Sequence, residues 1–206
     1  LEVLPLEETI GIVYQRGMAM ASLVPRDEFG QSAYAMGVIR PHHAGMTHEE
    51  AERMVEEITQ ETGHFLQIVN YNVRGRQYAV TGEHPALKRL ATILAARRTG
   101  KPPYVQVPGI DVPFHSRRLR DGVSAFRKAL EAAIPKDLDI IRLVGRYVPN
   151  LTATPFEISK SYIHTILEVA PSESLQAVLT EWEAWEDKPQ ELAWAMLVEL
   201  LAWQFA

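Results

Sequence analysis

The 206-residue sequence contains no cysteine, no long apolar run and no cluster of positive charge. The absence of cysteine excludes disulfides, thiolate metal sites and a cysteine nucleophile, and it is compatible with a cytosolic protein. The most apolar segment, 192–206, is interrupted by Glu199 and Gln204 and is shorter than the roughly 20 residues that a membrane span needs. The 21 lysines and arginines form no basic run and the net charge is −5, so neither nucleic acid nor an acidic membrane is a predicted partner.

The chain also lacks a nucleophile elbow, the G-x-S-x-G turn that presents a catalytic serine. The segment 30–32 has the sequence GQS, which begins like such an elbow, but the second glycine is missing. The first residues are acidic, so no signal peptide is predicted. Because the sequence begins with Leu1 and finishes inside an apolar helical pattern, we expect it to be a piece of a longer chain.

What the chain does contain is an alternation of strand-like and helix-like hydrophobic patterns. Hydrophobic residues make up 47% of the sequence and charged residues 23%, the proportions of an ordinary globular protein. Strands are predicted at 33–39, 65–71, 77–81, 104–107 and 139–143. Helices are predicted at 5–24, 47–62, 85–98, 117–133, 159–169, 172–185 and 190–206. The pattern therefore predicts an α/β protein.

Within residues 33–108 the predicted elements follow the order β-α-β-β-α-β, which is typical of a ferredoxin-like unit. The first helix of this unit starts with a T-x-x-E capping box at Thr47 and ends at Gly63. We therefore predict a ferredoxin-like subdomain at 33–108, with 1–32 and 109–206 as parts of a second subdomain.

His115 is the first candidate for chemistry. It follows Pro113 at a predicted junction between a strand and a helix, where a rigid loop could hold a general base. The alternative interpretation is a capping or surface histidine. Ser116 is not evidence for a Ser–His pair, because adjacent residues rarely face each other productively.

Arg16 is the second candidate. It lies at the rim of the apolar face of the first predicted helix, beside Val13 and Met20. A guanidinium there could bind a substrate carboxylate through two parallel hydrogen bonds. The alternative is a solvated or structural arginine.

Asn70 and Asn72 bracket the end of a predicted strand. Alternate residues of a strand point to one face, so both amides could face one site. Turn chemistry ahead of the 74–76 turn is the alternative. No carboxylate or third ligand lies at a recognised helical spacing from the histidines at 42, 43 and 48. We therefore interpret them as loop histidines and predict no metal site.

Short motifs, in the same order along the chain, resemble the malonyl/palmitoyl transferase domain of microbial type I fatty acid synthases. The motifs are YQRGMAM at 14–20, VNYNV with QYAVTG at 69–73 and 77–82, VPFHS at 112–116 and YVPNLTA at 147–153. The resemblance runs from about residue 4 to 206. It implies an α/β-hydrolase-like acyltransferase subdomain, formed by 1–32 and 109–206, with the ferredoxin-like βαββαβ subdomain inserted at 33–108.

The resemblance also implies an activity. Such a domain moves malonyl and long-chain acyl groups between CoA and acyl carrier protein through an acyl-serine intermediate. By this likeness His115 is the catalytic base, Arg16 binds the malonyl carboxylate, and the asparagines Asn70, Asn72 and Asn150 are substrate-binding candidates. The family's serine lies in an elbow just upstream of the arginine helix, outside these residues, so the chain alone is expected to be inactive.

The same likeness implies no cofactor or metal in this domain. The substrates are malonyl-CoA and other acyl-CoA thioesters together with the phosphopantetheine of the carrier protein. The other expected partners are the remaining domains of a large homo-oligomeric cytoplasmic multienzyme. We expect Arg16 and His115 to line one cleft. A non-catalytic ferredoxin-like binding or scaffold module is the alternative.

Overall fold

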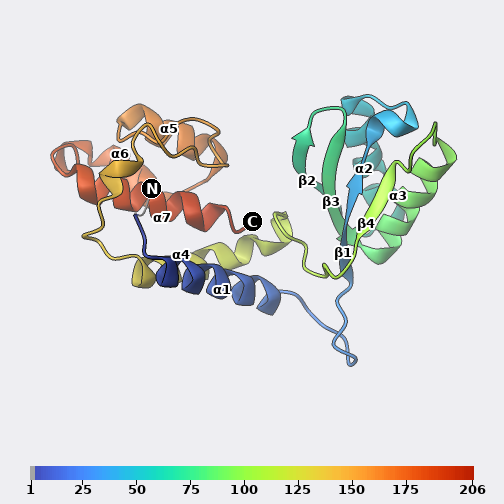
Figure 1. The fold of residues 1–206 in the computed structure, drawn as a ribbon, viewed down its shortest axis with the longest axis horizontal. Helices are drawn as coiled ribbons and strands as arrows, with labels where there is room; N and C mark the ends of the chain where they lie inside the picture. Colours follow the sequence, from blue (N-terminus) through green and yellow to red (C-terminus); the bar gives the residue numbers. More distant parts are fainter. Residues whose placement is uncertain (1–2) are drawn as a thin grey trace. The chain divides into compact units, whose positions relative to one another are not determined.

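The computed structural model describes residues 3–206 (Figure 1). They divide into two compact units. One, the helical unit, consists of the chain up to Ala19 together with Asp121–Ala206, and the other, the sheet unit, is Met20–Arg120. The architecture is mixed α/β, as the sequence patterns predict.

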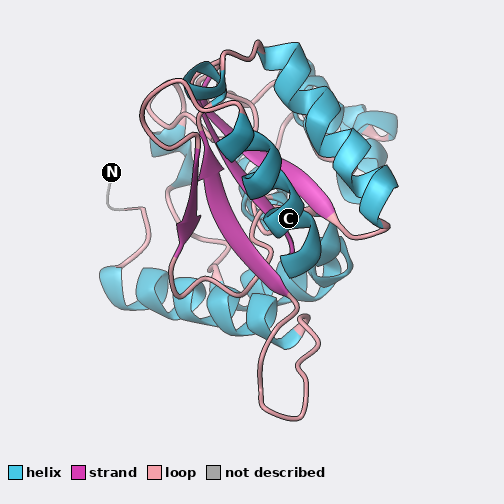
Figure 2. Cartoon of the chain, turned by 90° about the vertical axis from the view of Figure 1, so that its right-hand side faces the viewer, coloured by secondary structure: helices cyan, strands magenta, loops and turns pink. Residues whose placement is uncertain are grey.

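A four-stranded antiparallel sheet forms the centre of the sheet unit (strands in Figure 2). The strands are β1 (Tyr34–Ile39), β2 (Leu66–Val73), β3 (Gln77–Glu83) and β4 (Tyr104–Val107). Their order across the sheet is β2-β3-β1-β4, and each neighbouring pair is antiparallel. With two helices between the strands, the chain follows the predicted order β-α-β-β-α-β.

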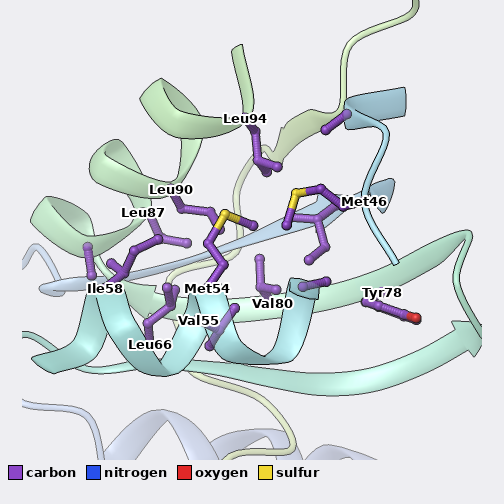
Figure 3. Close-up of a cluster of buried hydrophobic side chains, with 14 of the residues drawn as sticks. Met46, Met54, Val55, Ile58, Leu66, Tyr78, Val80, Leu87, Leu90 and Leu94 are labelled. Carbon is purple, nitrogen blue, oxygen red and sulfur yellow. The ribbon is translucent and has the colours of Figure 1, made fainter. Parts of the chain in front are cut away.

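Two helices, α2 (His48–Thr62) and α3 (His84–Ala96), pack with this sheet. Strand β1 buries alternate residues, including Ala35 and Ile39, as a strand with one core face should. Figure 3 shows side chains of both helices meeting strand residues such as Leu66 and Val80 in one apolar cluster. The apolar periodicity of the sequence therefore accounts for this core.

Helix α2 begins and ends where its sequence predicts. The Thr47 hydroxyl accepts a hydrogen bond from the backbone N–H of Glu50, and the Glu50 carboxylate accepts one from the Thr47 N–H, which completes the capping box. Gly63 ends the helix in the left-handed region at φ 67°, a conformation that glycine adopts without steric cost.

The helical unit is built from helices only, within the described residues. Helix α1 (Leu6–Ser22) begins in this unit and continues into the sheet unit. The remaining helices are α4 (Val123–Ala133), α5 (Lys160–Val169), α6 (Glu173–Thr180), α7 (Pro189–Trp203) and the 3₁₀ turns η3 (Ile140–Leu143) and η4 (Trp182–Ala184). Helix α7 contributes most of its length to the core. Within residues 3–206, no helix combines the length and the hydrophobicity that a membrane span requires.

The strand predicted at 139–143 is wrong, because these residues form the 3₁₀ turn η3. Adjacent β-branched isoleucines favoured a strand, but no strand of the described chain is available in this unit to pair with it. The 3₁₀ turn buries Ile140 and Leu143, three residues apart, on one side, where they join the apolar core formed with α7. Burial in the core therefore overrides the local β propensity.

Three predicted helices have an end that differs from the structure by three residues or more. The helix expected at 117–133 begins as a 3₁₀ turn, η2 (Arg117–Gly122), and becomes α-helical only from Val123. The helix expected at 172–185 ends at Thr180 and is followed by η4. Helix α7 ends at Trp203, three residues before the expected end.

Most apolar residues of helix α1 are exposed to solvent. Leu6, Ile10 and Val13 are 75%, 60% and 63% exposed, although their spacing is that of a core-facing stripe. Of the whole helix only Met20 is buried. Such a stripe is typical of a surface that packs against another part of a fold.

One buried ion pair joins α4 to α7. The Glu199 side chain is almost fully buried, and its Oε2 accepts a hydrogen bond from Arg127 Nη2 at 2.9 Å. Arg127 Nε lies 2.6 Å from Oε1 as part of the ion pair, and Oε1 accepts a hydrogen bond from the Ser174 hydroxyl at 2.8 Å. We expect Glu199→Leu to destabilise the helical unit by about 3–5 kcal/mol, because it leaves the Arg127 guanidinium largely buried without its counter-charge.

Urea unfolding followed by tryptophan fluorescence measures this loss, since the chain's four tryptophans all lie in the helical unit. Glu191→Leu, at an exposed position of the same helix, is the matched control and should change stability by less than about 1 kcal/mol. The double variant Glu199→Leu/Arg127→Met should recover much of the loss, because no buried charge remains. A double variant as unstable as the single one would contradict this explanation.

Candidate active site

His115 stands at the tip of a tight turn that follows β4. The turn is held by two short contacts: the Phe114 N–H donates to the Val112 carbonyl at 2.8 Å, and the Ser116 hydroxyl donates to the Pro113 carbonyl at 2.6 Å. His115 itself is exposed and has φ 57°, in the left-handed region. Histidine tolerates this region better than most residues, but the conformation still stores backbone strain of about 1–3 kcal/mol. An exposed imidazole on a rigid, strained turn is a typical arrangement for a catalytic side chain.

Ser116 is fully buried beneath this turn. Its hydroxyl donates to Pro113 and accepts a hydrogen bond from the backbone N–H of Arg118 at 3.3 Å. The hydroxyl therefore supports the turn and caps the following 3₁₀ helix. It is inaccessible to a substrate, in agreement with the sequence argument against a Ser116–His115 pair.

The residues after His115 attach the turn to the start of β2. The guanidinium groups of Arg117 and Arg118 lie 5.2 and 4.8 Å from the ring centroid of Phe65. The Arg117 N–H donates to the Gln67 side chain at 3.2 Å. The His115 turn is thus fixed to one end of the sheet.

A second contact holds the segment before the turn. Asp111 forms an ion pair with Arg26, and the hydrogen bond from that guanidinium holds the pKa of the Asp111 carboxyl below its ordinary value. Both side chains are partly exposed, so the pair contributes only modestly to stability. The pair restrains the chain segment that leads into Val112 and the His115 turn.

A hollow of about 400 Å³ lies beside this turn, between α2 and the edge strand β2. Arg117 lines it together with Glu52, Gln67 and Tyr71. It is open and mixed in polarity, within the size range of small-molecule sites.

Asn70 and Asn72 lie farther along β2, and both are exposed. Between them, the Tyr71 hydroxyl donates to the Glu52 carboxylate of α2 at 2.7 Å. Burial, and then this hydrogen bond, raise the pKa of Tyr71 to about 12. Register shifts between Ile68 and Asn70 and between Tyr71 and Val73 interrupt the regular pleat. That the two amides face one site stays a prediction.

Arg16 is half-buried on α1. Its Nη2 donates to the backbone carbonyl of Gln204 at 2.5 Å, just after the end of α7. Burial lowers the pKa of Arg16 from its ordinary value. None of the ion pairs found in residues 3–206 includes Arg16. A guanidinium has five N–H donors, so a cation held by one carbonyl keeps donors for an incoming carboxylate.

Gln204 is a residue that the sequence reasoning missed as a site component. Its carbonyl accepts the hydrogen bond from Arg16. Burial raises the pKa of Tyr147 above its ordinary value, and the nearby Gln204 side chain opposes this shift. In the sequence Gln204 appears only as a polar residue in an apolar helix, so no motif marked it. The structure thus connects Arg16 to the beginning of the YVPNLTA motif.

Asn150 lies on the same loop as Tyr147, at an exposed turn. The Ala153 N–H donates to the Pro149 carbonyl at 2.9 Å, and Ala153 has φ 52°. The Thr152 hydroxyl is hydrogen-bonded to the Tyr162 hydroxyl at 2.9 Å, which fastens the loop to α5. The loop therefore presents Asn150 from a restrained backbone.

The sequence-predicted site residues fall into the two units. Arg16 and Asn150 belong to the helical unit, whereas His115, Asn70 and Asn72 belong to the sheet unit. Their convergence on one cleft stays a prediction. In residues 3–206 no group of three or more histidine, aspartate and glutamate side chains is placed to hold a metal ion.

Comparison with known proteins relates this arrangement to a family. No protein-family model matches the chain. The fatty acid synthase subunit beta of Saccharomyces cerevisiae is 31% identical over 230 residues, a match that includes 90% of this chain. Fatty acid synthase 2 of Mycosarcoma maydis is 34% identical over 243 residues, covering 98% of the chain. The chain is homologous to a segment of fungal fatty acid synthases. It spans only 11% and 6% of the length of these two relatives.

Two solved structures have a similar fold. FabD from Acinetobacter baumannii superposes with a TM-score of 0.57 at 17% identity, covering 85% of this chain and 52% of that protein. Malonyl-CoA:acyl carrier protein transacylase from Xanthomonas oryzae gives 0.55 at 21% identity, covering 80% and 46%. The chain therefore has the fold of about half of a FabD-type protein.

Proposed function

We propose that this segment belongs to an acyltransferase of fatty acid synthesis, one that moves malonyl and long-chain acyl groups between CoA and acyl carrier protein. The observation that carries the proposal is homology to fatty acid synthases over nine-tenths or more of the chain. The exposed His115 on its strained turn supplies a side chain suited to such chemistry.

The fold supports a finer assignment. The order β2-β3-β1-β4, with every neighbouring pair antiparallel, is compatible with a ferredoxin-like subdomain at 33–108. Residues 1–32 and 109–206 would then belong to an α/β-hydrolase-like subdomain. FabD-type structures extend well beyond the matched part, and the exposed stripe on α1 is the kind of surface that such an extension would cover.

In the proposed reaction a serine outside these 206 residues attacks the thioester carbonyl of an acyl-CoA. The imidazole of His115 removes the serine proton as the new C–O bond forms, and returns it to the CoA sulfur as the C–S bond breaks. The thiol of the carrier protein's phosphopantetheine then attacks the acyl-serine ester. His115 takes the thiol proton and returns it to the serine oxygen.

Arg16 would select malonyl groups. Its free N–H donors pair with the malonyl carboxylate, while the Gln204 carbonyl keeps the guanidinium oriented. For a long apolar acyl chain this cation offers no matching charge, so Arg16 must turn aside or stay on Gln204. Asn70, Asn72 and Asn150 are the amides proposed to hydrogen-bond substrate.

The proposed partners follow from this chemistry. They are malonyl-CoA and other acyl-CoA thioesters, acyl carrier protein, and the further domains of a cytoplasmic homo-oligomeric multienzyme. The segment uses no metal or cofactor of its own in the proposed reaction.

Covalent labelling tests the proposal. A polypeptide that joins this segment to the rest of the acyltransferase should form a stable ester with radiolabelled malonyl-CoA, on a serine outside residues 1–206. The isolated 206-residue chain should take up no label, because it contains no G-x-S-x-G elbow and no cysteine. Label on Ser116 or any other serine of this chain would contradict the assignment. No label in the joined polypeptide would favour a non-catalytic binding or scaffold module.

A further inference from the structure

A second concave site lies in the sheet unit, around residues that the proposed acyl transfer does not use. It has a volume of about 500 Å³. Five of its lining side chains are basic or imidazole groups, and none is a carboxylate: Arg40, His42, His43, Arg76 and Lys101. They come from three separate stretches of sequence, which is why no motif revealed the cluster.

The backbone around this basic pocket is held in place. The Arg40 N–H donates to the Pro103 carbonyl at 2.7 Å. Both the backbone N–H and the hydroxyl of Thr99 donate to the His43 carbonyl at 2.9 Å. These contacts join the turn at 40–44 to the segment before β4. The basic side chains thus project from a preorganised frame, which reduces the entropy lost when a ligand binds.

The positive charge of the pocket is not neutralised from within. None of the ion pairs in the described part of the chain includes Arg40, Arg76 or Lys101. Burial, and then the neighbouring His43 and Arg76, hold the pKa of His42 below its ordinary value. The chain as a whole has a net charge of −5, so the pocket is a local exception.

We propose that this basic pocket binds a phosphate-bearing small molecule, either a diphosphate or a phosphate ester. Two arginines and a lysine around one hollow match the geometry and charge of phosphate oxygens, and the volume lies within the range of small-molecule sites. A concave pocket lined by residues of three segments favours a small ligand over an extended acidic chain.

The pocket is remote from the candidate catalytic turn within the same unit. The His115 turn contacts Gln67 near the start of β2, whereas Val73 at the other end of that strand lines the pocket. Six residue-to-residue steps along the strand separate the two positions by about 20 Å. The proposal therefore goes beyond acyl transfer at His115 and does not depend on it.

Binding of inorganic pyrophosphate to the 206-residue chain tests the site, in chloride buffer free of phosphate and sulfate. Calorimetry should detect binding, and NMR should show shifts of the His42 and His43 ring signals. The double variant Arg76→Gln/Lys101→Gln should bind about ten- to a hundredfold more weakly, because two charge-assisted contacts are lost. Arg74→Gln is the matched control: Arg74 lies on the same hairpin but pairs with Glu49 and does not line the pocket.

Absence of pyrophosphate binding, or equal loss in the control and the double variant, would overturn the proposal. So would binding of an acidic peptide that pyrophosphate does not displace. Coenzyme A is the second ligand tested in the same binding experiment. If it binds and the double variant abolishes this binding, the phosphate source is a CoA nucleotide, and if only pyrophosphate binds, the ligand is a separate phosphate compound.

Discussion

Replacing His115 by asparagine in the complete acyltransferase is expected to slow malonyl transfer by roughly a factor of 10²–10⁴. Asparagine is the informative substitution because it also tolerates the left-handed backbone that His115 adopts, at φ 57°. The turn should therefore keep its shape while the general base is lost. Single-turnover acylation with malonyl-CoA measures the rate of the affected step.

A control variant and a measurement of stability make this test specific. His164, an exposed histidine on α5, serves as the control, and His164→Asn should leave the acylation rate unchanged within about twofold. The melting temperature of His115→Asn should stay close to that of the unaltered protein. If acylation by His115→Asn is also within about tenfold of the original rate, His115 is a surface histidine and the proposed mechanism fails.

Arg16→Ala is expected to lower malonyl transfer about ten- to a hundredfold relative to palmitoyl transfer. A charge-assisted pair with the malonyl carboxylate contributes roughly 1.5–3 kcal/mol, and a palmitoyl chain has no carboxylate to lose. The ratio of the two kcat/KM values measures this selectivity. An equal loss for both substrates would show that Arg16 only anchors Gln204.

The contact between Arg16 and Gln204 calls for a matched comparison. Arg16→Lys keeps the charge but lacks the planar fork, so it should restore only part of the selectivity. Arg142→Ala, at an exposed position of η3, removes the same charge elsewhere in the helical unit and should leave the ratio unchanged. A shift in the ratio for Arg142→Ala would indicate a general effect of net charge.

The sheet unit could be predicted well from its sequence because its signals are local. The capping box at Thr47, the left-handed Gly63 and the alternation in β1 each specify a boundary or a face within a few residues. The helical unit was harder. The segment 139–143 has strand propensity, and only its burial at positions 140 and 143 beside α7 makes it a 3₁₀ turn.

The residues of the candidate site also differ in how far the sequence could reveal them. Short motifs mark His115 and Arg16 as candidates, but the strain at His115 depends on how Pro113 and Ser116 close the turn. Gln204 could not be identified, because its contact with Arg16 joins residues 188 positions apart. The basic pocket was missed for the same reason, since its side chains come from three distant stretches.

Local patterns and short motifs were enough to predict the α/β class, the order β-α-β-β-α-β, the candidate residues and the family resemblance. The partner of Arg16, the burial of Ser116, the strained turn at His115 and the basic pocket emerge only once the chain is folded. A side chain's partner, burial and backbone strain depend on residues brought together by the fold, and a local pattern carries no information about such distant neighbours.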